Sequence, residues 1–302
     1  MSMPLRVAFA ATLALSACTK TPPPPAAVPA PPGPAPSQSQ AAACEGGAAP
    51  ACDALAERWS SRDFARGAES ERGREAASAL ERGCVAHAVA AACLGHAIMR
   101  KAGTATGKAD PEGAKPFFGK LKALADLNGF RGEPPSPEGA SALARTNADC
   151  DGGRARACGQ LGWAAFNAVQ REKSVKDAFA SYARACELGS GNGCRWAGHF
   201  AATYPDDTGA GARADALLAR GCDELENAGA CDEHGSWKAK HGDASGAEGR
   251  WTRACEGGSR TGCAHLGEAL LARGDAKAKD ALELACAAGE DAACKKLASL
   301  PK

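Results

Sequence analysis

Two stretches of the chain decide the fold: residues 177–198 read DAFASYARACELGSGNGCRWAG, and residues 251–267 read WTRACEGGSRTGCAHLG. Each stretch has an aromatic residue four positions before a first cysteine. A second cysteine follows after seven intervening residues, and a glycine stands four positions beyond it. Similar stretches recur along the chain, and this recurrence indicates an internal repeat.

Cysteines mark the repeat along most of the chain. Fourteen of the 15 cysteines fall into pairs with seven or eight residues between the members. The pairs are Cys44 and Cys52, Cys84 and Cys93, Cys150 and Cys158, Cys186 and Cys194, Cys222 and Cys231, Cys255 and Cys263, and Cys286 and Cys294. First members lie 40, 66, 36, 36, 33 and 31 residues apart, and such a period predicts a solenoid.

The residues that flank the cysteines repeat as well. Eight positions before the first cysteine stand Ala76, Ala142, Ala178, Ala214, Ala247 and Ala278. Four positions before it stand Leu80, Thr146, Tyr182, Leu218, Trp251 and Leu282. Four positions after the second cysteine stand Ala56, Ala97, Gly162, Gly198, Gly235, Gly267 and Ala298. Spacings of four place residues on one helix face, and a small residue there lets a neighbouring helix approach closely.

Two helices are predicted between one cysteine pair and the next. In the unit from Cys263 to Cys286, Gly274 suits the position just past a helix end, and Asp275 suits the start of the next helix. No stretch shows sustained strand alternation. We therefore predict an all-α solenoid of antiparallel helix pairs, in which each pair needs its neighbours to bury its apolar face.

Each cysteine pair lies where one unit ends and the next begins. A connection of seven or eight residues can return the chain to the Cα separation of ~5.5 Å that a disulfide needs. We predict seven local disulfides, each of which stabilises the fold by ~2.5 kcal/mol in the chain-entropy model. The alternative is zinc binding, but this spacing matches no usual zinc motif.

The N-terminal residues read as an export signal. Arg6 precedes an apolar run over residues 7–17, which is too short to span a bilayer. The run ends in Leu15-Ser16-Ala17-Cys18, which resembles a bacterial lipobox. The resemblance implies that residues 1–17 are removed and that Cys18 is lipidated. The alternative is an ordinary signal peptide with a chance cysteine.

Residues 18–43 are predicted to form a proline-rich, disordered tether between the lipid and a repeat domain over residues 44–302. Thr19 stands where an Asp often retains lipoproteins in the inner membrane, so the expected location is the cell envelope with the outer membrane favoured. Lys and Arg number 36 against 35 Asp and Glu. This balance argues against a nucleic-acid surface, and membrane contact is expected through the lipid anchor only.

The cysteine pattern resembles the Sel-one-like repeat family, in its disulfide-stapled branch of exported bacterial proteins. The resemblance covers residues 44–302 and implies a right-handed α/α superhelix related to tetratricopeptide repeats. Such proteins mostly act as binding scaffolds, and some cysteine-rich members are described as penicillin-binding or weakly β-lactam-hydrolysing. The chain departs from the family in its scarce tyrosines, its shortened last two units and its oversized unit.

The oversized unit covers residues 94–149. It predicts an additional helix whose apolar residues are Phe117, Phe118, Leu121, Leu124 and Leu127. One interpretation is an insertion that packs its own apolar face. The other is a lid or a ligand contact on one face of the solenoid.

Catalytic motifs are scarce. The only Ser-x-x-Lys is Ser299 to Lys302 at the end of the sequence, and the partner motifs of penicillin-binding enzymes are missing. No zinc-hydrolase motif occurs, and His96 and His234 stand in a column that is mostly leucine, which favours packing over ligation. We predict no catalytic residue, no cofactor and no metal ligand.

Binding of a protein, a peptide or a cell-wall ligand is therefore the predicted function. By family resemblance, the helix after each second cysteine lines the concave side. The candidate contacts on those helices are Gln160, Trp163, Trp196, His199 and Trp237. The competing interpretation places the tryptophans in the core between repeats. Two alternative functions remain: an enzyme acting on β-lactams or peptidoglycan, by family resemblance alone, and a passive structural lipoprotein.

Overall fold

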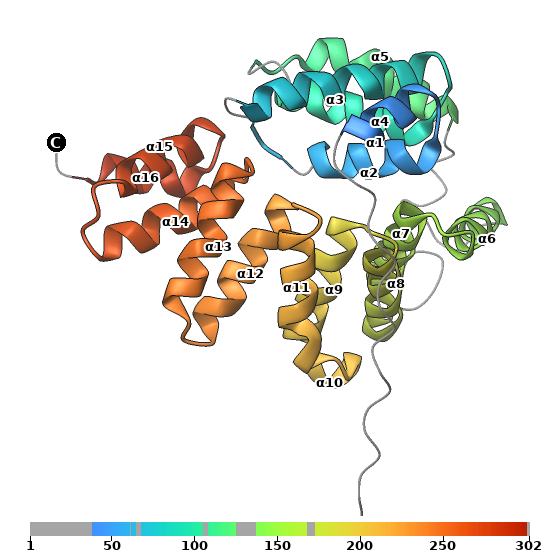
Figure 1. The fold of residues 1–302 in the computed structure, drawn as a ribbon. Coiled ribbons are helices and arrows are strands. Elements are labelled where there is room, and N and C mark those ends of the chain that lie inside the picture. Colours follow the sequence, from blue (N-terminus) through green and yellow to red (C-terminus); the bar gives the residue numbers. More distant parts are fainter. Residues whose placement is uncertain are drawn as a thin grey trace, which may run out of the picture. The chain divides into compact units, whose positions relative to one another are not determined.

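A computed structural model describes residues 38–60, 62–64, 68–104, 108–124, 137–167 and 173–300. The predicted signal peptide, Cys18, most of the tether and Leu127 lie outside the described residues. The described residues form α-helices and no β-strand (Figure 1). This agrees with the predicted all-α class.

The helices follow one another along the chain with short connections. Their bounds are α1 Gln38–Glu45, α2 Ala49–Ser60, α3 Ala68–Val85, α4 Ala90–Ala102, α5 Pro111–Leu124, α6 Pro137–Asp151, α7 Ala155–Phe166, α8 Val175–Glu187, α9 Gly191–Thr203, α10 Pro205–Thr208, α11 Ala214–Asp223, α12 Ala228–Lys240, α13 Ala244–Glu256, α14 Arg260–Ala272, α15 Ala278–Ala287 and α16 Asp291–Ala298. Each helix that follows a second cysteine packs against the next main helix of the chain, for example α7 on α8, α12 on α13 and α14 on α15. The helices after second cysteines also contact one another, as α9 contacts α12 and α12 contacts α14. The described chain is thus the predicted series of helix pairs.

The repeated glycine column has a direct packing reason. Within four units the glycine of the first helix lies under the large residue of the second helix, in the pairs Gly162 and Tyr182, Gly198 and Leu218, Gly235 and Trp251, and Gly267 and Leu282. A Cβ atom built on any of these glycines would come within 2.9 Å of that large side chain. The small residue therefore fixes how closely the two helices of a pair approach.

All seven expected cysteine pairs are bonded in the structure. Their Cα atoms lie 4.4 to 4.8 Å apart. In the five shorter loops a glycine with positive φ stands three positions after the first cysteine: Gly47, Gly153, Gly189, Gly258 and Gly289. In the two longer loops a non-glycine residue takes this conformation one position later, Ala88 with φ 55° and Glu226 with φ 48°. The loop therefore closes through one left-handed residue in every unit.

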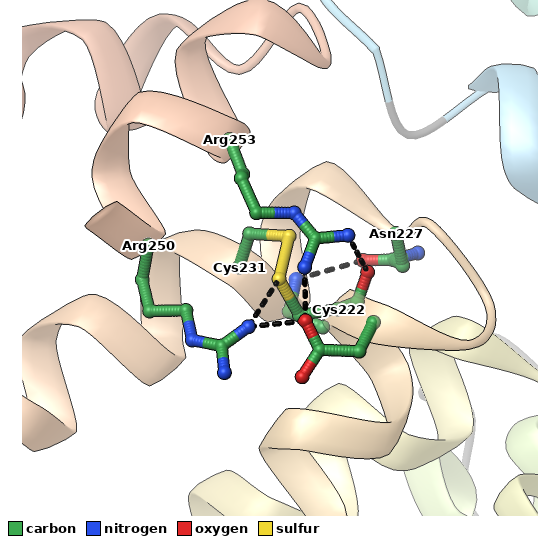
Figure 2. The surroundings of a disulfide bond; sticks show 7 residues. Cys222, Asn227, Cys231, Arg250 and Arg253 are labelled. Atoms are coloured by element: carbon green, nitrogen blue, oxygen red, sulfur yellow. Dashed lines mark hydrogen bonds and ion pairs between the residues drawn. A yellow bond between two sulfur atoms is a disulfide. The ribbon is translucent and has the colours of Figure 1, made fainter. Parts of the chain in front are cut away.

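Figure 2 shows the loop closed by Cys222 and Cys231. Arg250 and Arg253 of α13 both pair with Asp223 beside the disulfide. Arg253 also donates to the carbonyl oxygen of Cys222 at 3.3 Å. The helix of one unit is thus tied to the disulfide loop that precedes it.

The oversized unit contributes the additional helix α5, as predicted. Helix α5 packs on α4, where the Phe117 ring lies 4.2 Å from the His96 ring between centroids. Phe117 and Phe118 pack against the core of the first helices. The side chains of Leu121 and Leu124 are outside the described set. These contacts agree with an insertion that packs its own apolar face.

The folded region begins earlier than predicted. Helix α1 starts at Gln38, six residues before Cys44, so residues 38–43 are not part of a disordered tether. Ala41 is buried there and belongs to the core around the first disulfide. Alanine has high helix propensity, so Ala41, Ala42 and Ala43 extend the helix although they follow directly on the proline-rich segment.

Candidate functional site

A cavity of about 500 Å³ lies among α2, α4, α7, α8 and α9. Its lining residues are Asp53, Ala56, Glu57, Ser60, Leu94, Gly95, Arg156, Gly159, Gln160, Trp163, Tyr182, Ser190, Asn192, Gly193, Arg195 and Trp196. The cavity therefore joins residues of the first units to residues about 100 positions later in the chain. No described side chain of α5 lines it, which disagrees with a lid role for that helix at this cavity.

One side of the cavity is aromatic. Trp163 is 43% exposed and Trp196 is 36% exposed, and apart from Val85 they are the exposed large apolar residues of the described ranges. The Tyr182 ring stacks near Trp196 with 6.1 Å between centroids. The guanidinium of Arg195 lies 5.1 Å from the centroid of the Trp196 ring. Burial raises the pKa of Tyr182 to about 12, so its hydroxyl remains a hydrogen-bond donor at neutral pH.

The polar lining residues of the cavity include Glu57 of α2. Glu57 Oε1 accepts a hydrogen bond from the Ser190 hydroxyl at 2.8 Å and another from the Asn192 backbone N–H at 2.5 Å. Ser190 is the N-cap of α9 and Asn192 lies in its first turn, where a carboxylate is favoured by the helix dipole. Burial raises the pKa of Glu57, and the two hydrogen bonds oppose this shift only in part.

Asp53 lies one turn earlier on α2 beside two arginines. Its Oδ2 is 3.4 Å from Arg154 Nη2, whereas its buried Oδ1 has no hydrogen-bond partner. Burial raises the pKa of Asp53 against the opposing charges of Arg154 and Arg156. Burial also lowers the pKa of Arg156, which the carboxylates of Asp53 and Glu57 oppose. The polar wall is therefore a compact cluster of mutually compensating charges.

Three of the five predicted contact residues meet at this cavity: Gln160, Trp163 and Trp196. His199 lies next to them, with its ring edge-on to Trp196 and its Nδ1 3.4 Å from Glu233. Burial raises the pKa of Glu233, but the hydrogen bonds and charges of His199 and Arg195 together outweigh this effect and leave the pKa below its ordinary value.

Trp237 is not among the cavity residues. Its ring stacks on His241 with 3.9 Å between centroids, and it packs against the core cluster that contains Phe200. This placement follows the competing interpretation, in which a tryptophan belongs to the packing between repeats.

Sequence reasoning missed Asp53, Glu57 and the arginines of the polar wall. A usable signal existed, because Glu57 stands five positions after a second cysteine, in the same register as Trp163 and His199. The register does not reveal that α2 contacts α9, because Glu57 and Asn192 lie 135 positions apart in the sequence.

Two histidines that we predicted to pack rather than ligate are buried. His96 Nδ1 lies 2.9 Å from the carbonyl oxygen of Ala77, and His234 Nε2 lies 2.7 Å from Asp215. Burial lowers the pKa of both histidines. Among the described residues, no group of three or more His, Cys, Asp or Glu side chains is arranged to hold a metal ion. Ser299 donates its hydroxyl to the carbonyl oxygen of Lys296 at 2.6 Å, and Lys302 is outside the described ranges.

Comparison with solved structures gives a similarity to a Sel1 repeat protein from Oxalobacter formigenes, known from a crystal structure. The identity is 20%, the match covers 72% of this chain and 93% of that chain, and the TM-score is 0.42. The chain is similar to a Sel1 repeat protein. No protein-family model matches it, and no curated protein matches it. The helix pairs and local disulfides described above carry the fold assignment by themselves.

Proposed function

We propose that this protein is a lipid-anchored scaffold of the bacterial envelope that binds a protein or peptide partner at the aromatic cavity. The observation that carries the proposal is the exposure of Trp163 and Trp196 at one cavity, on the helices α7 and α9 of neighbouring units. Exposed aromatic side chains bury large areas on binding and lose little side-chain entropy.

The surrounding groups fit a peptide. Gln160 and Arg195 line the same cavity as the tryptophans and offer hydrogen bonds to backbone and side-chain groups. Binding is favoured over catalysis because Ser190, the cavity hydroxyl beside a carboxylate, already serves a structural purpose. It donates to Glu57 and accepts from the backbone N–H of Gly193 at the start of α9.

Substitution of the two tryptophans tests the proposal. Trp163→Ala and Trp196→Ala are each expected to abolish capture of a partner from envelope extract, with the disulfides kept intact. Because both side chains are partly exposed, the melting temperature should fall by no more than a few degrees. Val85→Ala is the matched control, since Val85 is an exposed apolar residue outside the cavity.

Two results would contradict the proposal. One is a Trp163→Ala protein that still captures the same partner as the unsubstituted protein. The other is a large loss of stability in that variant, which would assign the tryptophan to the core. If the protein captures a purified cell-wall fragment and no protein, the partner is a cell-wall ligand and not a peptide.

Attachment to the membrane is proposed through Cys18, on the strength of the lipobox-like sequence at residues 15–18. None of the described helices is long and apolar enough to cross a bilayer. Two or three acyl chains would give stable anchoring, at ~0.8 kcal/mol for each buried CH₂. Mass spectrometry of the mature N-terminus should find an acylated Cys18, and the Cys18→Ala protein should leave the membrane fraction. Continued partitioning of that variant with membranes would contradict the anchor.

A further inference from the structure

Helix α2 and the residues after it contact the disulfide-loop regions of four later units. We name residues 49–60 together with residues 62–64 the latch. The contacts run in chain order from Asp53 to Arg154, from Glu57 to Ser190 and Asn192, from Arg58 to Glu226, and from Asp63 to Gly258 and Arg260. Each of these four latch residues therefore contacts a different later unit, and the order of the residues follows the order of the units.

Two of these contacts place a carboxylate at the start of a helix. Glu57 accepts from the backbone N–H of Asn192 in α9, and Asp63 accepts from the backbone N–H of Arg260, the first residue of α14, at 3.0 Å. The first N–H groups of a helix have no partner within the helix, and the helix dipole favours negative charge there. The latch thus satisfies donors that the later units leave open.

The charges of the latch complement the groups that they meet on the later units. Arg58 is positive and pairs with Glu226, which stands in the loop before α12. The chain then returns to a negative residue, Asp63, beside the side chain of Arg260. The Asp63 backbone N–H also donates to the carbonyl oxygen of Gly258 at 2.8 Å. This order of charges fixes one register between the latch and the loops.

The two faces of α2 differ in kind. Leu55 and Trp59 are buried in the core shared with α1, α3 and α4. The residues that face the later units are Asp53, Glu57 and Arg58, which make hydrogen bonds and ion pairs. The ion pair of Arg58 with Glu226 has one exposed partner, and that of Asp63 with Arg260 is exposed on both sides. Exposed ion pairs are weak and are screened by salt, whereas the apolar core is not. Helices α1–α5 should therefore stay folded when their contact with the later units opens.

We propose that the latch is a reversible closure that holds α1–α5 over the aromatic cavity and controls access to it. Asp53, Ala56, Glu57 and Ser60 of the latch supply one wall of that cavity. Opening removes this wall and frees the donors at the start of α9. The inference rests on the proposed function, because it concerns access to the same binding site.

Hydrogen exchange of individual amides, followed by NMR on the full folded chain, tests the closure. The reporters are the N–H groups of Asn192, Arg260 and Asp63, each of which is bonded across the latch contact. The matched controls are the N–H groups of Gly193 and Gly262, which are bonded to Ser190 and Ser259 within their own units. Arg58→Glu places like charges opposite Glu226, and all three reporters are expected to exchange about fivefold faster or more while the controls stay unchanged.

A charge exchange completes the design. Adding Glu226→Arg to Arg58→Glu restores an ion pair of reversed sense, and the reporters should return toward the rates of the unsubstituted protein. Arg184→Glu is the control substitution, because Arg184 pairs with Glu187 of its own helix and should leave the reporters unchanged. Acrylamide quenching of Trp163, taken as the difference from the Trp163→Phe protein, should increase in Arg58→Glu.

Results of two kinds would overturn the closure. The first is a change confined to the neighbourhood of Glu226, with Asn192 and Arg260 unaffected. The second is a double variant whose reporter amides exchange as fast as those of Arg58→Glu alone. If Arg58→Glu fails to fold, the unsubstituted protein decides in a salt series from ~0.05 to ~0.5 M, where the Asp63 and Arg260 reporters beside the exposed ion pair must accelerate and the controls must not. No ligand takes part in these measurements, so failure of the latch and failure of the tryptophan test are distinguishable.

Discussion

At the scale of single residues, the glycine under each large side chain has no room for a larger residue. In Gly198→Ala the new methyl group would meet Leu218 Cγ at 2.5 Å, so α9 and α11 must move apart. We expect a loss of about 1–3 kcal/mol in the free energy of unfolding. Gly249→Ala is the control, because nothing lies within 4 Å of its added methyl group. The free energy of unfolding of Gly249→Ala should rise by up to about 1 kcal/mol from helix propensity. An equal loss of this free energy in both variants would refute the packing explanation.

His265 carries a pH dependence of stability. A hydrogen bond to Asp232, with Nδ1 and Oδ1 2.7 Å apart, raises its pKa against the effect of burial, and the charges of Asp232, Glu268 and Glu233 add to the rise. A group with a raised pKa in the folded state stabilises fully below its unfolded pKa of ~6.5 and loses this contribution as the pH rises through the folded value. We therefore expect the melting temperature to fall as the pH rises from ~6.5 through the folded pKa of His265, and this contribution to level off above it.

Asp232→Asn is the variant that tests this assignment. Its His265 should titrate by NMR near the ordinary histidine range, and the alkaline loss of stability should shrink. An unchanged His265 titration in Asp232→Asn would show that another group raises the pKa.

At the scale of elements, the disulfide loop is the unit that the sequence predicted best. Its two cysteines lie only eight positions apart, so spacing alone identified Cys186 and Cys194 as partners, and the structure bonds them with Cα atoms 4.4 Å apart. Replacing both by alanine should cost about 2.5 kcal/mol, the loop-closure entropy returned to the unfolded chain. Urea unfolding measures this cost. A cost near zero would mean that the glycine at 189 and the Ser190 cap hold the loop without the bond.

The ends of elements were harder to predict than their existence. The additional helix α5 followed from the apolar residues Phe117, Phe118, Leu121, Leu124 and Leu127, among which spacings of three and four recur. The start of α1 at Gln38 did not follow, because residues 38–43 contain no large apolar residue to mark a face. Burial of the small Ala41 decides that boundary. Because the whole sequence is rich in alanine, a buried alanine adds little to the apolar periodicity that marks a helix.

At the scale of the whole molecule, the cavity is the feature that no local pattern reveals. Repeat spacing brings Trp163 and Trp196 to one face, since both stand in corresponding helices. The polar wall instead needs α2 to meet α7 and α9, and this contact depends on a few ion pairs and helix-end hydrogen bonds. Such contacts join residues more than 100 positions apart and follow no period, so the sequence predicted Gln160, Trp163 and Trp196 at the cavity and missed its polar wall.

Reduction of all seven disulfides should unfold the described domain at temperatures where the oxidised protein is stable. Its core consists largely of alanine and cysteine, with few large side chains fully buried, so apolar burial per residue is low. Each closed loop spans eight or nine residues and contributes about 2.5 kcal/mol in the chain-entropy model. Seven such contributions exceed the net stability of most domains, ~5–15 kcal/mol. Circular dichroism with and without reductant measures the effect. A melting temperature that does not change on full reduction would show that the helix packing is sufficient without the bonds.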